Sequence, residues 1–289
     1  MDDFKDAVAV VTGAGSGIGF ALAKAAQARG AKLAISDIRQ DALDDARAKL
    51  EAGGDVVALR GDVADFADVE ALAQATIDRF GKVNLLFNNA GVFASGVAWQ
   101  MSLEEYDWVI GVNQKSVIHG IKAFVPRMIA QADRCHVTTV SSGAGITVNP
   151  GFASYSMTKH AVLALSEALY LDLATQGVGN IGVTVVMPGV IQSRIMFPEK
   201  TGPAAIQAEL SNRLQNPVLD GLESFMRQAV DAGLPADALA DQVFAAIAAG
   251  DLYVLPNFTD EASQARAQAI ALGRATAQNP YKAGLVPPA

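Results

Sequence analysis

Tyr155 and Lys159 are the two side chains whose types and spacing best suit chemistry in this sequence. They are four residues apart in a segment with the apolar spacing of a helix, which would place them on one face. A free tyrosine titrates near ~10, too high for an efficient base at neutral pH. A cation about 4 Å away would stabilise the phenolate by roughly 4 kcal/mol at an effective dielectric of about 20. At ~1.36 kcal/mol per unit, the tyrosine pKa would then fall by about three units. The pair therefore predicts a general acid/base at Tyr155.

The same spacing is also typical of a surface tyrosine that packs on a lysine stem, so the position of the pair has to decide. The pair opens a helix that follows an expected strand at residues 136–140 and the segment Ser141-Ser142-Gly143. A serine hydroxyl near Tyr155 can hydrogen-bond a substrate oxygen and stabilise developing charge. The position therefore favours a role in proton transfer for Tyr155.

A glycine-rich turn links the first expected strand to the first expected helix. It reads Thr12-Gly13-Ala14-Gly15-Ser16-Gly17-Ile18-Gly19. Glycine permits a tight turn and a close approach of backbone to a ligand. The amino end of the helix adds free N–H groups and a positive dipole end, which suit a pyrophosphate. An ordinary strand-to-helix turn can also be rich in glycine, but the elements on both sides favour nucleotide binding.

Acidic residues after the second and third strands suggest which nucleotide binds. Asp37 lies 18 residues past Gly19, where a carboxylate can accept hydrogen bonds from adenosine ribose hydroxyls and repel a 2′-phosphate. This favours NAD over NADP. A helix-capping role for Asp37 stays open, and Arg39 could instead pair with a phosphate. Asp62 and Val63 could contact the adenine ring, although a simple loop aspartate fits that spacing nearly as well.

Short apolar runs alternate with longer amphipathic segments along most of the chain. The runs are rich in Val, Ile and Leu and are bounded by Gly, Asp, Asn or Pro, as expected of strands buried on both faces. They span residues 8–11, 32–36, 56–59, 83–88, 136–140, 183–187 and 252–255. Helical spacing predicts helices at residues 18–29, 41–52, 66–80, 103–129 and 155–175. This alternation predicts an α/β fold with a doubly wound parallel sheet and right-handed crossovers.

Residues 1–289 are predicted to form a single nucleotide-binding domain, because no linker divides the chain. A long insertion at residues 194–234 interrupts the rhythm between the sixth and seventh strands. Irregular loops of this length in a compact domain are usually functional or mobile. A C-terminal extension at residues 256–289 carries an expected helix at 260–277 and an expected poorly ordered tail at 280–289.

The composition excludes several classes of protein. The chain has a net charge of −8, with 51% hydrophobic and 18% charged residues, which argues against a nucleic-acid surface and against general disorder. Its one cysteine, Cys135, cannot form an internal disulfide, and its three histidines lack metal-ligand spacing, so we expect no metal. No run approaches ~18 apolar residues, so we expect no membrane span. The acidic amino terminus is unlike a signal peptide, and we expect a cytoplasmic protein.

Five motifs follow one another within roughly residues 7–193. They are the turn at 12–19, Asn88-Asn89-Ala90-Gly91, Ser142, Tyr155-Ser156-Met157-Thr158-Lys159 and Pro188-Gly189. In this order and spacing they resemble the short-chain dehydrogenase/reductase family, in an NAD-type member. The resemblance implies a Rossmann-like seven-stranded sheet in an α/β/α sandwich, a nicotinamide cofactor, a small-molecule substrate and a homotetramer or homodimer. Residues 106–128 and the C-terminal part also resemble bacterial dehydrogenases of lignin-derived benzylic alcohols.

The resemblance assigns roles to single residues. It makes Tyr155 the acid/base and selects Ser142, 13 residues earlier, over its neighbour Ser141 as the substrate hydrogen-bond donor. Lys159 would bond the nicotinamide ribose and continue a proton relay, and Asn113 would help to bind a water in that relay. Without the resemblance, Asn113 reads as an ordinary polar residue in the middle of a helix.

The predicted cofactor contacts combine the acidic positions with the family motifs. The segment at residues 188–193 would border the nicotinamide, with the backbone of Val190 on its carboxamide, and Ser193 keeps a hydroxyl where the family usually has threonine. The full set is Gly13, Gly15, Ser16, Gly17, Ile18, Gly19, Asp37, Asp62, Val63, Asn89, Ala90, Gly91, Tyr155, Lys159, Pro188, Gly189, Val190 and Ser193.

The insertion should cover the substrate pocket as an apolar lid. Candidate substrate contacts are Ser142, Phe93, Val148, Phe152, Met196 and Phe197, and Arg194 could meet an anionic group. We therefore expect a fairly apolar secondary alcohol or ketone. An ordinary core of extra helices would explain the apolar residues of the insertion equally well.

These observations predict an NAD(H)-dependent oxidoreductase that acts on CH–OH groups. The alternatives are an NADP-dependent ketoreductase of the same family and a nucleotide-sensing protein on the same fold. A sensor would not need Tyr155 and Lys159, and both are present. A nucleotide-sugar epimerase or dehydratase would need a larger C-terminal substrate domain than the insertion at 194–234 supplies.

Overall fold

A computed structural model of the chain describes residues 4–197, 202–212, 217–256 and 261–281. Its centre is a seven-stranded parallel sheet in the order β3-β2-β1-β4-β5-β6-β7. The strands are β1 (Val8–Thr12), β2 (Lys32–Asp37), β3 (Val56–Arg60), β4 (Leu85–Asn88), β5 (Cys135–Val140), β6 (Ile181–Val186) and β7 (Tyr253–Val254). All seven expected strands are present, each within two residues of the predicted bounds at both ends.

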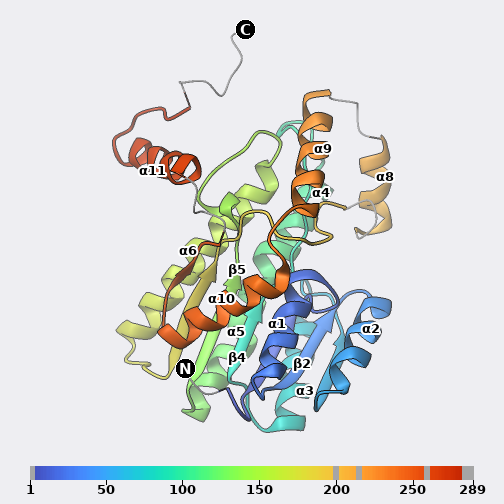
Figure 1. Cartoon of the computed structure of the whole chain (residues 1–289), viewed down its shortest axis with the longest axis vertical. Helices are drawn as coiled ribbons and strands as arrows, with labels where there is room; N and C mark the ends of the chain where they lie inside the picture. The colour runs from blue at the N-terminus through green and yellow to red at the C-terminus, as the bar shows by residue number, and fades with distance from the viewer. Residues whose placement is uncertain (1–3, 198–201, 213–216, 257–260, 282–289) are drawn as a thin grey trace.

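The sheet lies between two layers of helices (Figure 1). One layer is α1 (Gly17–Ala28), α2 (Gln40–Glu51) and α10 (Ala236–Ala249), whose Leu22, Leu43 and Phe244 are buried in one core cluster. The other includes α3 (Phe66–Phe80), α5 (Ser116–Gln131) and α6 (Ala153–Thr175), with buried Leu72 and Phe124. The strand order reverses between β1 and β4, and ligands of such sheets bind beyond the carboxyl ends of the strands at this point.

The helix expected at residues 103–129 is divided. It consists of α4 (Leu103–Ile110), a π-helical turn (Gly111–Lys115) and α5. Ser102 caps α4: its hydroxyl accepts a hydrogen bond from the Glu105 N–H at 3.0 Å, and its own N–H donates to the Glu105 carboxylate at 2.9 Å. The prediction of one continuous regular helix is therefore wrong, because a π-helical turn, a feature frequent at functional sites, interrupts it at Asn113.

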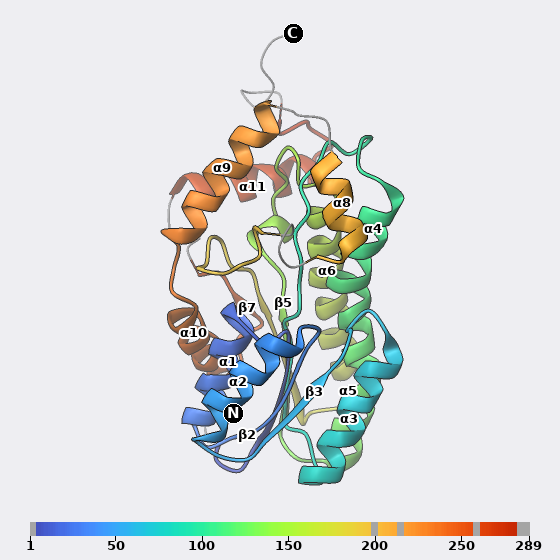
Figure 2. The ribbon, with the colours of Figure 1, turned by 90° about the vertical axis from the view of Figure 1, so that its right-hand side faces the viewer.

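The insertion is largely helical where the structure describes it, which corrects the expectation of an irregular loop. It holds α8 (Ala204–Asn212) and α9 (Pro217–Asp231), and its two ends meet where Leu234 bridges to Ile191. The expected C-terminal helix is α11 (Glu261–Ala275). In both views, α8, α9 and α11 lie at one end of the molecule beyond the strands (Figures 1 and 2). Most of the expected tail, residues 282–289, lies outside the described residues.

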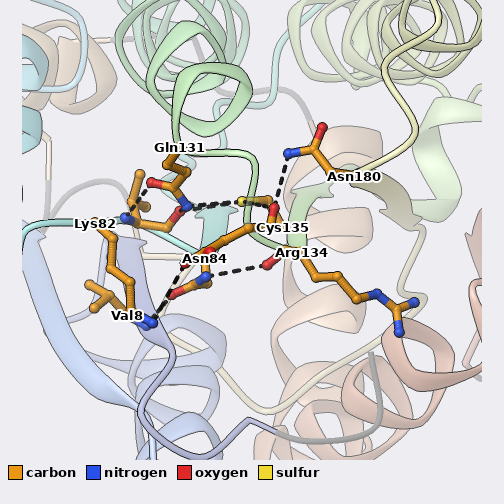
Figure 3. A network of polar contacts seen from close by, with 9 residues as sticks. Val8, Lys82, Asn84, Gln131, Arg134, Cys135 and Asn180 are labelled. Atoms are coloured by element: carbon orange, nitrogen blue, oxygen red, sulfur yellow. Dashed lines mark hydrogen bonds and ion pairs between the residues drawn. The ribbon is translucent and has the colours of Figure 1, made fainter.

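A polar network ties together the opposite, amino ends of the central strands (Figure 3). The Val8 N–H donates to Asn84 Oδ1 at 3.0 Å, and Asn84 Nδ2 donates to the Arg134 carbonyl at 3.3 Å. Gln131 Nε2 donates to the sulfur of Cys135 at 3.1 Å. Burial raises the pKa of the Cys135 thiol to about 11, so this cysteine stays protonated and packs as part of the scaffold.

Among the helices that the structure describes, none is both long and apolar enough to span a bilayer.

Candidate active site

A cavity of about 760 Å³ opens at the carboxyl ends of the strands. Six strands contribute to it, because Gly13, Asp37, Asp62, Asn89, Ser142 and Pro188, which lie at or just after the ends of β1 to β6, all line its wall. Parallel strands bring their carboxyl ends to one edge of the sheet, so residues far apart in sequence converge there. The cavity therefore lies where the strand order predicts a ligand.

The glycine-rich turn forms the floor of this cavity. Gly13 has φ +66°, and a Cβ there would lie 2.8 Å from the Ala90 Cα. A Cβ on Gly19 would lie 2.1 Å from the Gly13 carbonyl oxygen, so no side chain fits at this position. Ser16 precedes α1, and within the described chain no side chain caps the amino end of this helix. Its N–H groups and positive dipole end suit a phosphate, so the cradle fits a dinucleotide.

Asn89 holds the turn in place. Its side-chain Nδ2 donates to the Thr12 carbonyl at 2.8 Å and to the Gly13 carbonyl at 3.2 Å. The Thr12 hydroxyl in turn accepts hydrogen bonds from the backbone N–H groups of Asn89 and Ala90 at 3.1 and 3.2 Å. The Asn-Asn-Ala-Gly segment thus fastens the end of β4 to the turn after β1.

Asp37 lies at the end of β2 with both carboxylate oxygens engaged by backbone. Its Oδ2 accepts from the Gly15 N–H at 2.9 Å and its Oδ1 from the Arg39 N–H at 3.0 Å. Asp37 lines the cavity, whereas Gly15, a predicted cofactor contact, does not. A Cβ on Gly15 would lie 2.7 Å from Asp37 Oδ2, so this glycine gives the carboxylate room beside the turn.

Asp62 and Val63 line the cavity next to this position. Asp62 Oδ1 accepts a hydrogen bond from the Ala64 N–H at 2.9 Å, which fixes the carboxyl group in a tight turn. His119 Nδ1 donates to the Val63 carbonyl at 2.9 Å, so this histidine supports the loop from behind. Asp62 is thus a loop aspartate, and this loop also forms part of the cavity wall.

Tyr155 and Lys159 lie in the first two turns of α6 and are 8% and 3% exposed. Lys159 Nζ lies 5.5 Å from the centre of the Tyr155 ring and donates to the Val140 carbonyl at 2.9 Å. The phenol packs edge-on against Phe93, with ring centres 5.1 Å apart, and forms a hydrogen bond with the Ser142 side chain. The three predicted groups Ser142, Tyr155 and Lys159 are therefore brought together in the cavity wall.

Burial dominates the acid–base properties of this pair. Burial raises the pKa of Tyr155 to about 12, and the hydrogen bond with Ser142 offsets only part of this rise. Burial also lowers the pKa of Lys159 to about 8. The expected fall of the tyrosine pKa to near neutrality is wrong for the protein alone, because desolvation of the phenol outweighs the field of an ammonium that bonds Val140.

Ser141 and Ser142 have different environments. The Ser141 hydroxyl donates to the Lys159 carbonyl at 2.8 Å and is buried under α6. The Ser142 hydroxyl accepts from the Ala144 N–H at 3.1 Å and forms the hydrogen bond with Tyr155. Both serines line the cavity, but the Ser141 hydroxyl is engaged by α6, and the catalytic role of Ser142 stays a prediction.

Asn113 lies behind the wall and is 1% exposed. Its Oδ1 accepts from the Val92 N–H at 2.8 Å, and its Nδ2 donates to the Val92 carbonyl at 2.9 Å and to Thr158 Oγ1 at 3.3 Å. The side chain thus ties the π-helical turn to the segment after β4 and to α6. The contacts of the Asn113 side chain among the described residues are therefore with the protein, and its part in a proton relay stays a prediction.

The remaining predicted residues divide into two groups. Those in the wall are Ser16, Gly17, Ile18, Gly19, Ala90, Gly91, Phe93, Phe152, Gly189, Val190, Ser193, Arg194 and Met196, joined by Met226 and Val230 of α9. Val148 and Phe197 lie outside it: the Val148 carbonyl accepts from Arg266, and Phe197 packs under the Arg227 guanidinium, 4.8 Å from its ring centre. Arg266 and Asn149 do line the wall, and sequence reasoning missed both.

The sheet order and the cavity at its switch point define a Rossmann-like nucleotide-binding fold. The sequence pattern of the family described as short chain dehydrogenase matches residues 7–202. The chain therefore belongs to the short-chain dehydrogenase/reductase family, whose members are oxidoreductases acting on small molecules.

Similar proteins come from several bacteria. A C alpha-dehydrogenase of Sphingobium sp. is 36% identical over 261 residues, 89% of this chain and 82% of that protein. A CLA biosynthesis dehydrogenase/reductase of Lactiplantibacillus plantarum is 32% identical, over 88% of this chain and 89% of its own length. The solved structure of a short-chain dehydrogenase/reductase from Burkholderia phymatum in complex with NAD superposes with a TM-score of 0.91 at 35% identity, covering 100% of this chain and 99% of that one. The family and the fold of this chain are thus established by similarity.

Proposed function

We propose that this protein is an NAD(H)-dependent dehydrogenase of fairly apolar secondary alcohols, or a reductase of the corresponding ketones, with Tyr155 as the general acid/base. The observation that carries the proposal is that Ser142, Tyr155 and Lys159 line one cavity with the glycine-rich turn, with the Lys159 Nζ 5.5 Å from the centre of the Tyr155 ring. This arrangement supports proton transfer at Tyr155 beside a dinucleotide bound in the glycine-rich cradle.

The cradle would hold the dinucleotide. The amino end of α1 suits the pyrophosphate, Asp37 the adenosine ribose, and the segment Pro188–Ser193 the nicotinamide side. When bound, a nicotinamide cofactor supplies the hydride acceptor or donor and, in its oxidised form, a positive charge that favours the phenolate of Tyr155.

Tyr155 would accept the hydroxyl proton of an alcohol, and in the reverse direction it would protonate the oxygen of a ketone. The Ser142 hydroxyl would donate a hydrogen bond to the same oxygen and stabilise its partial charge. The Val140 carbonyl fixes Lys159 beside the phenol, where its charge favours loss of the phenolic proton. Phe93 and Phe152 exclude water from one side of the phenol.

Asp37 supports a preference for NAD over NADP, because its carboxylate would repel a 2′-phosphate at the ribose. Arg39 is already paired with Asp41, whose Oδ2 lies 3.3 Å from its guanidinium. The Arg39 Nε, however, is buried without a hydrogen-bond partner among the described residues, and this favours the alternative of an NADP-dependent ketoreductase. The NAD in the similar Burkholderia phymatum structure supports the first choice.

The walls near Tyr155 support a fairly apolar substrate. Phe93, Phe152 and Tyr155 form an aromatic cluster with Met196 and with Val230 of the insertion. The similarity to a C alpha-dehydrogenase of Sphingobium sp. agrees with secondary alcohols as the class to test first.

A panel of secondary alcohols with NAD, followed through the absorbance of the reduced cofactor, tests this function. The proposal predicts turnover of at least one aromatic or alicyclic alcohol, with NAD used in preference to NADP. A protein that binds NADH but turns over none of the alcohols or ketones would instead be a nucleotide sensor.

A further inference from the structure

Helix α11 brings a cation to the cavity from outside the segment that matches the family pattern. Arg266 and Ser263 of this helix both line the wall, whereas the family pattern ends at residue 202. In both views α11 lies at the end of the molecule that faces the carboxyl ends of the strands (Figures 1 and 2). Arg266 therefore belongs to a part of the cavity wall that lies outside the family pattern.

Arg266 is anchored by one of its terminal nitrogens. Nη2 donates to the Val148 carbonyl at 2.8 Å and to Asn149 Oδ1 at 3.0 Å. Nε is buried without a hydrogen-bond partner among the described residues. Two neutral oxygens thus orient the guanidinium but leave its charge uncompensated, and a partly desolvated cation without an anion is costly.

Three other arginines among the described residues form ion pairs of the kind that Arg266 lacks. Arg29, Arg79 and Arg127 each pair with a carboxylate, at distances between 2.5 and 2.9 Å. Within the described residues, no carboxylate lies within salt-bridge distance of Arg266. Arg266 lines the cavity instead, and an anion that enters this cavity would supply the missing charge.

The position of Arg266 points to the substrate rather than to the dinucleotide. Its two acceptors belong to the loop between β5 and α6, which also carries Ser142 and leads into α6. Asn149 lies six residues before Tyr155 in sequence, and both residues line the wall together with Phe152. The glycine-rich turn and Asp37, by contrast, come from β1 and β2 at the other side of the switch point.

We propose that Arg266, oriented by Asn149, binds a carboxylate of the substrate, so that the physiological alcohol or ketone has an apolar body and an anionic end. This inference rests on the proposed function and narrows its substrate class. Val148 and Asn149 engage both hydrogens of Nη2, so a substrate carboxylate would accept a charge-assisted hydrogen bond from Nη1. The aromatic cluster around Tyr155 would hold the apolar body between the two polar ends.

The test compares each keto acid with its methyl ester, which differ in charge but little in shape. The ligands are methyl-ketone acids of increasing chain length, from 4-oxopentanoate to 9-oxodecanoate, and 4-acetylbenzoate. Binding is measured by titration calorimetry to the full chain carrying Tyr155→Phe, with NADH present, so that affinity is read without turnover. For at least one length the acid should bind about 10-fold to 100-fold more tightly than its ester, the range of a charge-assisted hydrogen bond.

Variants of α11 assign this preference to one residue. Arg266→Leu should bring the acid-to-ester ratio close to one, and Arg266→Lys should leave an intermediate ratio. Arg274→Leu is the matched control, because Arg274 lies on the same helix, bonds His160 at 3.2 Å and is not part of the wall. Arg274→Leu should keep the same acid-to-ester affinity ratio as the protein with Arg266 and Arg274 unchanged.

An unchanged ratio in Arg266→Leu, or no acid preferred at any length, would overturn the carboxylate site. If Arg266→Leu does not fold, Arg266→Gln replaces it, because glutamine removes the charge and keeps a polar side chain; an unchanged acid-to-ester ratio there would equally overturn the site. A carboxylate preference that depends on Arg266, in a protein that oxidises none of the corresponding hydroxy acids with NAD or NADP, would support the site and refute the proposed dehydrogenase.

Discussion

Lys159 Nζ lies 5.5 Å from the centre of the Tyr155 ring and is held there by a 2.9 Å hydrogen bond to the carbonyl oxygen of Val140. The ammonium is thus fixed by the end of β5 as well as by its own helix. A lysine on the surface of a helix would move among rotamers, whereas this one has a single partner and a buried stem. Its charge is therefore held in place beside the phenol.

Tyr155→Phe removes the hydroxyl and keeps the ring packing against Phe93. We expect turnover to fall by about 10²- to 10⁴-fold, the usual contribution of a general acid/base. NADH binding, followed by fluorescence, should stay near that of the unmodified protein. Substantial residual turnover in this variant would refute the role of Tyr155.

Ser142→Ala and Ser141→Ala form a matched pair of substitutions. Ser142→Ala should lower kcat by roughly 10²- to 10³-fold, because it removes the donor to the substrate oxygen. Ser141→Ala should chiefly lower the free energy of unfolding, by about 1 to 3 kcal/mol, because the buried Lys159 carbonyl loses its side-chain donor. Kinetics and urea unfolding of both variants separate the two effects, and equal kinetic losses would contradict the assignment.

The buried Lys159 makes stability depend on pH. Its pKa is about 8 in the folded protein and 10.5 ordinarily, so between these values the unfolded chain binds more protons than the folded one. The free energy of unfolding contributed by this group therefore rises with pH from about 8 to 10.5. Lys159→Met should remove that rise. Urea unfolding of both proteins at pH 7.5 and 9.5 measures the difference, and parallel pH profiles would contradict the burial of a titrating ammonium.

Asp37→Asn keeps the shape of the side chain and removes its charge. The ratio of kcat/KM for NAD to that for NADP should fall by about 10-fold or more, because the repulsion of a 2′-phosphate is lost. Asp41→Asn tests whether Arg39 can bind a 2′-phosphate. It removes the ion-pair partner of Arg39 and should raise activity with NADP. A preference for NADP in the unmodified protein would show that Arg39 outweighs Asp37.

Local sequence patterns were sufficient for the fold. Apolar runs bounded by Gly, Asp and Asn marked all seven strands, because strands buried on both faces must be apolar throughout. The glycine-rich turn was also readable, because its backbone conformation and close packing admit only glycine at Gly13 and Gly19. The sequence did not predict the division of the segment at residues 103–129. The π-helical turn there accompanies contacts of Asn113 with Val92 and Thr158, which are distant in sequence.

Tertiary structure decided the chemistry around these positions. The sequence placed Lys159 one turn from Tyr155, but the partner of its ammonium is Val140, 19 residues away, and the burial of both groups reverses the expected pKa of the tyrosine. Arg266 reaches Asn149 across 117 residues and turns an apparently separate C-terminal helix into part of the cavity. Periodicity and turn preference are local properties that a sequence displays directly. Desolvation and charge pairing depend on which distant groups share a volume, and only the folded chain determines that.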